Sequence, residues 1–114
     1  MAADCIFCRI ANGEIPARVV YSDDHVVAFH DVAPKAPTHV LVIPRRHVAT
    51  LLDPGADDAE LLGRINAAAI AVARELGLAD GFRLVFNCGE HAGQSVFHLH
   101  LHLLGGREFS WPPG

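Results

Sequence analysis

Three histidines stand at alternate positions close to the C-terminal end of the chain: His98, His100 and His102, in the stretch QSVFHLHLHLLGG of residues 94–106. Side chains of a β-strand alternate between its two faces, and neighbours on one face lie roughly 7 Å apart. A strand here would place the three imidazoles on one face and the intervening apolar side chains on the other. Those apolar side chains are Phe97, Leu99, Leu101 and Leu103.

Three kinds of chemistry fit three aligned imidazoles. They could form a three-histidine metal site of the kind that activates water. They could be core histidines satisfied by hydrogen bonds, although each ring buried without partners costs on the order of 1–3 kcal/mol, which disfavours this for three at once. They could also supply a nucleophile, because an imidazole with a pKa of about 6.5 is neutral at physiological pH. That role needs a partner that holds the proton on Nδ1 and turns the Nε2 lone pair toward an electrophile.

The loop directly before the histidines carries groups that a phosphoryl electrophile requires. It runs from Asn87 to Ser95 and reads NCGEHAGQS. Gly89 and Gly93 permit backbone N–H groups to approach an anion closely, and Gln94 and Ser95 add side-chain donors. Most polar, glycine-containing loops are ordinary turns, so it is the position directly before the histidines that favours a phosphate-binding role.

Cys5 and Cys8 form a C-x-x-C pair, which offers two of the four ligands of a tetrahedral zinc site. Two idle thiols are the alternative interpretation. The chain holds three cysteines, and an odd number in a reducing compartment argues against a disulfide framework. We interpret the third, Cys88, as a small buried hydrophobic side chain.

The elements that must position these residues begin with short patterns. We expect a helix over residues 5–12, ended by Gly13 in a left-handed conformation. Two β-rich runs follow, at residues 17–21 and 26–29, with a hairpin turn at residues 22–25. A third strand at residues 39–43 is closed by Pro44, which cannot donate to a ladder.

The clearest helix follows Asp53-Pro54-Gly55 and ends at Gly77. Its acidic N-terminal residues suit the helix dipole, and an apolar stripe follows at helical spacing. The acidic residues are Asp57, Asp58 and Glu60, and the stripe is Leu61, Leu62, Ile65, Ala69, Val72 and Leu76. Two more strands are expected, at residues 82–87 and 96–104. Five strands with short links and two helices predict an α+β fold, an antiparallel sheet with the helices packed to one side, in a single domain spanning residues 1–114.

Composition and charge exclude several classes of function. Hydrophobic residues make up 51% of the chain, which is enough for a packed core and argues against disorder. The net charge is −4 and the few Lys and Arg are scattered, so the basic stripe of a nucleic-acid-binding protein is missing. The N-terminal residues show no basic region and no long apolar run, so we expect no signal peptide, no membrane partner and a cytoplasmic location.

The stretch from His98 to Leu104 resembles the signature of the histidine triad (HIT) superfamily, His-φ-His-φ-His-φ-φ, in which φ is apolar. Further segments are similar to the histidine triad nucleotide-binding branch of that superfamily: AFHD at 28–31, APTH at 36–39, GQSV at 93–96 and WPPG at 111–114. The resemblance extends from about Cys5 to the last residue. It implies a five-stranded antiparallel sheet with two helices that pairs into a ten-stranded sheet in a homodimer.

The resemblance also implies a purine nucleotide substrate and a role for each histidine. His100 would attack the α-phosphate and form a nucleotidyl-histidine intermediate, while His98 and His102 would orient it or lie near the phosphate. His39 would join the proton network, and Ser95 would relay a proton to the leaving group. Donors around the phosphate oxygens would supply most of the catalysis, and no carboxylate cluster for Mg²⁺ is apparent, so we expect no catalytic metal.

Other positions would bind the nucleotide itself. Asn87, Gln94 and Ser95 would hold phosphate oxygens and the leaving group, and Asp31 would accept hydrogen bonds from the ribose hydroxyls. The remaining nucleotide-binding positions are Phe7, Ile10, Phe29, His30, Val32, Leu41, Gly93, Val96, His100 and His102. Among the apolar members, which would line the base pocket, Phe7 and Ile10 fit ordinary core packing equally well.

Some members of the superfamily hold zinc on four positions that correspond here to Cys5, Cys8, His47 and His98. Four protein ligands leave no open position, so such a zinc would be structural. Zinc on His98 would also explain why His100 is the histidine that is free to react. Other members of the branch lack the cysteines, so the site is optional to the fold.

The function that the resemblance implies is hydrolysis of purine nucleoside 5′-phosphoramidates. A dinucleoside polyphosphate hydrolase or nucleotidyl transferase of the same superfamily is the enzymatic alternative, and the short chain with its WPPG ending favours the first. A non-catalytic nucleotide-binding regulator and a zinc-dependent scaffold are the alternatives outside enzymology. The intact triad together with Ser95 argues against both.

Overall fold

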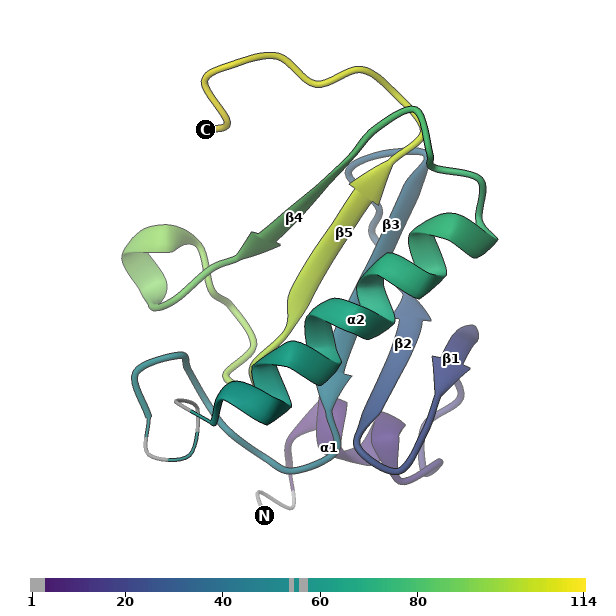
Figure 1. Cartoon of the computed structure of the whole chain (residues 1–114). Helices are drawn as coiled ribbons and strands as arrows, with labels where there is room; N and C mark the ends of the chain where they lie inside the picture. The colour runs from purple at the N-terminus through teal and green to yellow at the C-terminus, as the bar shows by residue number, and fades with distance from the viewer. Residues whose placement is uncertain (1–3, 54, 56–57) are drawn as a thin grey trace.

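A computed structural model describes residues 4–53, 55 and 58–114. Its centre is one antiparallel sheet with the strand order β1-β2-β3-β5-β4, crossed by the long helix α2 (Figure 1). The strands are β1 (Val19–Ser22), β2 (Val26–His30), β3 (Thr38–Pro44), β4 (Phe82–Phe86) and β5 (Leu101–Gly105). The helices are α1 (Ile6–Ala11), α2 (Ala59–Glu75) and the short 3₁₀ helix η1 (Glu90–Ala92). The predicted five-stranded α+β fold is confirmed.

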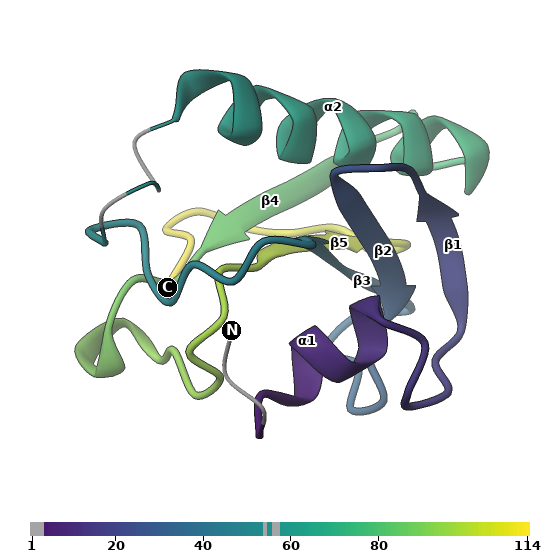
Figure 2. The same cartoon turned by 90° about the horizontal axis from the view of Figure 1, so that it is seen from below.

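Helices α1 and α2 lie on opposite faces of the sheet (Figure 2). The expectation that both helices pack to one side is therefore wrong. All four residues from Val26 to Phe29 are buried. Val26 and Ala28 belong to the apolar cluster under α2, while Val27 and Phe29 belong to the cluster that contains Phe7 of α1. Because β2 is apolar on both faces, each face needs a cover, and one helix supplies each.

Helix α2 begins as its sequence predicts. The Asp58 carboxylate accepts hydrogen bonds from the backbone N–H groups of Glu60 and Leu61, at 3.0 and 3.2 Å, which satisfies two donors that the first turn leaves open. Leu76, expected in the apolar stripe, is instead the C-terminal capping residue and is 36% exposed. Gly77 follows with a φ of 74° and ends the helix. Asp57 and Pro54 lie outside the described residues.

The histidine stretch is a strand only in its second half, so the predicted strand at 96–104 is wrong at its start. Strand β5 begins at Leu101, whose ladder partner on β3 is Val42. Continuing that register would set Leu99 opposite Pro44, which has no N–H to donate. Leu99 donates its N–H to the Val48 carbonyl instead, at 2.6 Å.

Side-chain alternation nevertheless persists through the irregular half. Leu99, Leu101 and Leu103 are all buried in the cluster under α2, so the neighbouring histidines face the α1 side of the sheet. Phe97, expected to join those leucines, is 42% exposed. Within the described part of the chain, no helix has the length and apolar character needed to cross a bilayer.

Candidate active site and metal cluster

His98 connects the two functional parts of the molecule. Its ring is fully buried, and Nε2 donates a hydrogen bond to the Pro44 carbonyl at 2.8 Å. Since a carbonyl only accepts, the proton of the neutral ring lies on Nε2, and Nδ1 carries a lone pair that can accept a hydrogen bond or bind a metal. Burial lowers the pKa of His98 to about 4, so at neutral pH the ring is an uncharged base, the form that a metal ligand requires.

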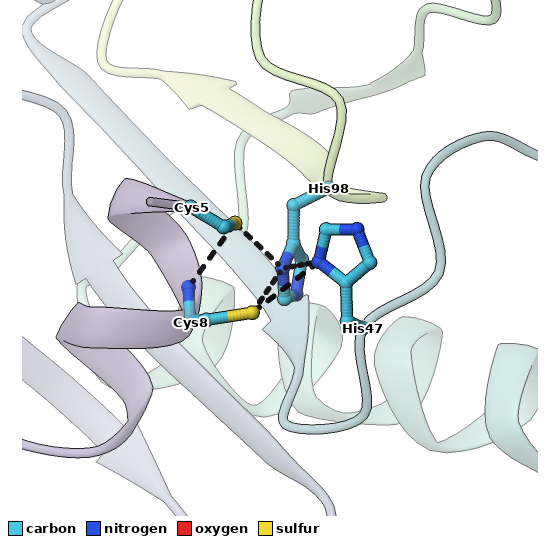
Figure 3. A group of neighbouring side chains, drawn as sticks. All are labelled: Cys5, Cys8, His47 and His98. Atoms are coloured by element: carbon cyan, nitrogen blue, oxygen red, sulfur yellow. Dashed lines mark hydrogen bonds between the residues drawn. The ribbon is translucent and has the colours of Figure 1, made fainter. Parts of the chain in front are cut away.

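The Nδ1 atom of His98 faces Cys5, Cys8 and His47, as Figure 3 shows. It lies 3.4 Å from Cys5 Sγ, 3.5 Å from Cys8 Sγ and 3.2 Å from His47 Nδ1. Cys8 Sγ is 3.3 Å from His47 Nδ1. Tetrahedral zinc with bonds of about 2.0–2.3 Å sets its nitrogen and sulfur ligands about 3.3–3.8 Å apart. The four side chains therefore have the donor types and the spacing of a tetrahedral zinc site.

Three separate segments supply this cluster. Cys5 is the N-cap of α1 and accepts a hydrogen bond from the Cys8 N–H, so the two thiols lie on one side of the helix start. His47 follows the end of β3, and His98 precedes the start of β5. A metal held by all three segments would fasten α1 to the irregular half of the histidine stretch.

His100 has the geometry of a nucleophile. Its Nδ1–H donates to the His98 carbonyl at 2.7 Å, which leaves the lone pair on Nε2. Within the described residues Nε2 has no hydrogen-bond partner, and since no fully buried side-chain nitrogen or oxygen lacks one, Nε2 reaches the surface. Burial lowers the pKa of His100, against the opposing influence of the His98 carbonyl and Asp31, and this keeps the ring neutral.

A chain of hydrogen bonds fixes the proton positions beside His100. The Lys35 backbone N–H donates to His39 Nδ1 at 3.0 Å, so His39 carries its proton on Nε2. His39 Nε2 then donates to His102 Nδ1 at 2.9 Å, which leaves the His102 proton on Nε2. Burial lowers the pKa of both rings, that of His102 to about 4. His102 therefore presents a neutral donor whose ring centre is 4.9 Å from that of His100.

Asp31, His39 and His102 also come close enough together to resemble a metal site. Asp31 Oδ2 lies 3.5 Å from His39 Nε2. A metal on His39 Nε2 would require the ring proton to sit on Nδ1, where the Lys35 N–H already donates. The hydrogen bonds therefore favour a proton network at this position over metal ligation.

The loop between β4 and the histidines leaves two side chains available to a ligand. The Asn87 amide and the exposed Ser95 hydroxyl have no hydrogen-bond partner within the described residues. The backbone N–H groups of Gly89, Gly93 and Gln94, in contrast, donate to Gln94 Oε1, the Glu90 carbonyl and the Gly89 carbonyl. These three N–H groups are therefore not available to form the anion-binding concavity that the glycines led us to expect.

Only some of the residues expected to bind the nucleoside lie close together in the structure. Phe7, Phe29 and Leu41 are buried together on the α1 side of the sheet, with Ile10 and Val96 packed against them. The Phe7 ring also meets the ring of His100 edge to face, with centroids 5.1 Å apart.

Two of the expected nucleotide-binding residues, and Cys88, which was expected to be buried, are more exposed than this group. Val32 is fully exposed, and His30 at the end of β2 is partly buried. Cys88 is half-buried rather than enclosed.

Several groups that set the geometry are backbone atoms, which sequence reasoning missed. The Pro44 carbonyl orients His98, the His98 carbonyl orients His100, and the Lys35 N–H orients His39. Every residue carries a similar backbone, so no residue type marks such a role. Pro44 was the one available signal, since its position at the end of a strand was visible in the sequence.

The chain is similar in sequence and structure to proteins of one family. The model of the HIT domain family matches residues 12–109. A HIT-like protein of Synechocystis sp. is 54% identical over 114 residues, with both chains covered completely. The crystal structure of a HIT family hydrolase from Legionella pneumophila is 54% identical with a TM-score of 0.93, and covers 97% of this chain and 100% of its own.

A Zn-bound histidine triad family protein from Mycobacterium smegmatis is more distant. It is 34% identical with a TM-score of 0.79, over 91% of this chain and 76% of its own. The family model covers most of the chain, and the Synechocystis relative matches it from end to end. The chain therefore belongs to the HIT domain family.

Proposed function

We propose that the protein hydrolyses purine nucleoside 5′-phosphoramidates through a covalent nucleotidyl intermediate on His100. The observation that carries the proposal is the hydrogen bond from His100 Nδ1–H to the His98 carbonyl. It holds the ring in the tautomer whose Nε2 lone pair is free at the surface. The hydrolase from Legionella pneumophila, at 54% identity, supports a hydrolytic reaction.

The reaction proceeds in two displacements. His100 Nε2 attacks the α-phosphorus, the P–N bond breaks, and the departing nitrogen takes a proton and leaves as an amine. Water then attacks the nucleotidyl-histidine, the new P–N bond to His100 breaks, and the nucleoside monophosphate leaves while the ring returns to its neutral form. Both steps depend on positioning and on donors around the phosphate oxygens.

Neighbouring side chains fit the remaining roles. The free Ser95 hydroxyl relays the proton to the departing nitrogen, and the free Asn87 amide donates to the leaving group or a phosphate oxygen. Asp31 uses Oδ1 to accept the Ala33 N–H at 2.9 Å and keeps lone pairs on Oδ2 for the ribose hydroxyls. The His102 Nε2–H donates to a phosphate oxygen, and His39 holds His102 in that tautomer.

The charges around the triad favour a small leaving group over a polyphosphate. Against the effect of burial, Asp31 raises the pKa values of His39, His100 and His102, and Lys35 lowers that of His39 alone. Among the described residues no arginine shifts the pKa of these three rings. A polyphosphate chain needs several cationic donors, whereas an amine needs only a proton.

We further propose that Cys5, Cys8, His47 and His98 bind a structural zinc ion. The four ligand atoms leave no position for substrate, and bound zinc would supply cross-linking between segments. The Zn-bound relative from Mycobacterium smegmatis supports this choice of metal. Thiols kept reduced for such a site fit a cytoplasmic location.

We propose that the working unit is a homodimer with a continuous ten-stranded sheet. Strands β1 and β4 form the two edges of the five-stranded sheet. Phe82, the first residue of β4, is 39% exposed, and an exposed edge that starts with an aromatic side chain favours pairing with a second copy. Sedimentation equilibrium tests this, since a mass of one chain at micromolar concentration would exclude the dimer.

Parallel assays of two substrate classes test the proposed function. The purified protein is incubated with adenosine 5′-phosphoramidate and with diadenosine tetraphosphate, and AMP release is measured for each. We expect kcat/KM for the phosphoramidate to exceed that for the dinucleotide by more than tenfold. A preference for the dinucleotide would instead assign the chain to the polyphosphate hydrolases, and failure of both substrates with intact AMP binding would indicate a nucleotide-binding regulator.

A further inference from the structure

Gln94 is buried in a loop whose neighbouring residues are exposed. Its side chain is 4% exposed, whereas Gly93 and Ser95 on either side are exposed. The amide makes three hydrogen bonds, all to backbone groups. Oε1 accepts the Gly89 N–H at 2.9 Å, and Nε2 donates to the Ala49 carbonyl at 2.8 Å and to the Val96 carbonyl at 3.1 Å.

These contacts use the donors that a phosphate would need. An amide nitrogen carries two hydrogens, and both are committed to the carbonyls of Ala49 and Val96. A phosphate oxygen accepts hydrogen bonds and so gains nothing from Oε1. Direct contact between Gln94 and the phosphate would require the amide to abandon buried partners, which is costly.

The three backbone partners lie in different segments. Gly89 is at the start of the loop, Val96 is just beyond its end, and Ala49 belongs to the segment that follows β3. The Val48 carbonyl of that segment accepts from the Leu99 N–H, and the carbonyl of Pro44, the last residue of β3, accepts from His98. One amide therefore closes the loop across its base and joins it to the segment that holds the irregular half of the histidine stretch.

We propose that Gln94 is a positioning residue that sets the phosphate-facing geometry of this loop without contacting the substrate. This proposal rests on the proposed function, because it concerns the positions of Ser95 and Asn87 relative to His100. The role needs one acceptor and two donors in a fixed arrangement, which a glutamine amide provides. A misplacement of about 1 Å at a reacting centre can lower a rate by about 10²-fold.

Two substitutions separate the parts of this role. Gln94→Ala removes all three hydrogen bonds. Gln94→Glu keeps the volume and an acceptor for the Gly89 N–H, but it sets a carboxylate oxygen against the Ala49 and Val96 carbonyls. The matched control is Asn66→Ala, which removes an amide-to-carbonyl hydrogen bond of 2.8 Å to Leu62 on α2, on the other face of the sheet.

The experiment combines a structural and a functional measurement. Hydrogen exchange of the Gly89 amide is followed by NMR in the nucleotide-free protein, and affinities for AMP and adenosine are measured by calorimetry alongside kcat and KM for adenosine 5′-phosphoramidate. We expect Gln94→Ala to speed Gly89 exchange through loss of the acceptor, and Gln94→Glu to speed it because repulsion from the Ala49 and Val96 carbonyls displaces the side chain. Both variants should lower kcat/KM by about 10- to 100-fold. AMP affinity should fall while adenosine affinity stays within about twofold, and Asn66→Ala should leave all of these values at the wild-type level.

Two results would overturn the proposal. Loss of kcat/KM with unchanged Gly89 exchange would mean that Gln94 contacts the phosphate directly. Normal kcat/KM with fast Gly89 exchange would mean that the hydrogen bonds serve folding alone. If the alanine variant does not fold, the glutamate variant decides between the same outcomes. If the wild-type protein binds AMP without hydrolysing the phosphoramidate, the proposed function fails, and the AMP and adenosine affinities still test the role of Gln94.

Discussion

The two halves of the histidine stretch are held in place by different contacts. Residues 101–105 form β5, which is bonded to β3 on one side and β4 on the other. Residues 94–100 belong to no strand and are held by the Gln94 amide, the Val48 carbonyl and the cluster around His98. His100 lies where the two halves meet.

The difference explains how a rigid sheet can present His100 in the tautomer that its proposed role as nucleophile requires. In a central strand every backbone carbonyl is committed to a ladder, so none is left to orient a side chain. Because the chain leaves the ladder before Leu101, the His98 carbonyl is free to accept a hydrogen bond from His100 Nδ1–H. The sheet fixes the position of His102, and the irregular half sets the tautomer of His100.

The largest expected effect comes from the nucleophile itself. His100→Ala should lower kcat by more than about 10⁴-fold, since the covalent route is lost rather than one acid–base group. Far-ultraviolet circular dichroism should remain close to wild type, because the ladder of β5 starts after His100. Steady-state kinetics with adenosine 5′-phosphoramidate measures the loss. A variant that retains near-native rates would exclude the nucleotidyl-histidine mechanism.

The irregular half should depend on metal. The double variant Cys5→Ser and Cys8→Ser should lose bound zinc and the stability that comes with it. A ligand held at about 1,000 times its Kd stabilises the native state by about 4 kcal/mol, so we expect a loss of that order. Elemental analysis of protein purified without chelators, followed by denaturant unfolding, measures both. Cys88→Ser is the control, and metal-free wild-type protein of equal stability would assign the cysteine pair to plain packing.

A substitution in the β5 half should lower stability without changing the zinc content. Leu103 is fully buried under α2, and Leu103→Ala should lower the free energy of unfolding by about 3 kcal/mol through the cavity it creates. The four proposed zinc ligands lie outside β5, so bound zinc per folded chain should stay the same. Denaturant unfolding and elemental analysis together check this. Joint loss of zinc and stability would show that the two halves form a single unit.

Sequence reasoning succeeded where a residue type marks its own role. The alternation of histidine and leucine placed Leu99, Leu101 and Leu103 in one apolar cluster, as observed. The resemblance to the HIT superfamily pointed to four metal ligands, and those four side chains do come together. Periodicity and ligand chemistry depend on side chains, which the sequence states directly.

It failed where the outcome depends on what lies opposite in space. The start of β5 follows from Pro44 facing Leu99 across the sheet, and that pairing exists only once the register is known. The side of the sheet that α1 covers follows from the burial of both faces of β2. The backbone partners of the Gln94 amide likewise become visible only in the fold, and whether Gln94 also binds phosphate stays a prediction.

The smallest expected effect is a pH dependence of stability that belongs to the sheet half. Burial, followed by the neighbouring rings of His100 and His39, lowers the pKa of His102 to about 4, compared with about 6.5 for an unfolded histidine. Between these values the unfolded chain binds a proton at His102 that the folded chain does not. The free energy of unfolding should therefore fall as the pH drops from 6.5 toward 4.

Partial exposure of His102 reduces this contribution to on the order of 1–2 kcal/mol. Denaturant unfolding at pH 7.5 and pH 5 measures it, and His102→Gln should show a smaller loss of stability between the two pH values than the wild-type protein. His91→Gln, at an exposed position in η1, is the matched control and should keep the wild-type dependence. Equal pH dependence in the wild-type and His102→Gln proteins would assign the acid sensitivity to the other buried histidines, His39, His98 and His100, whose pKa values burial also lowers.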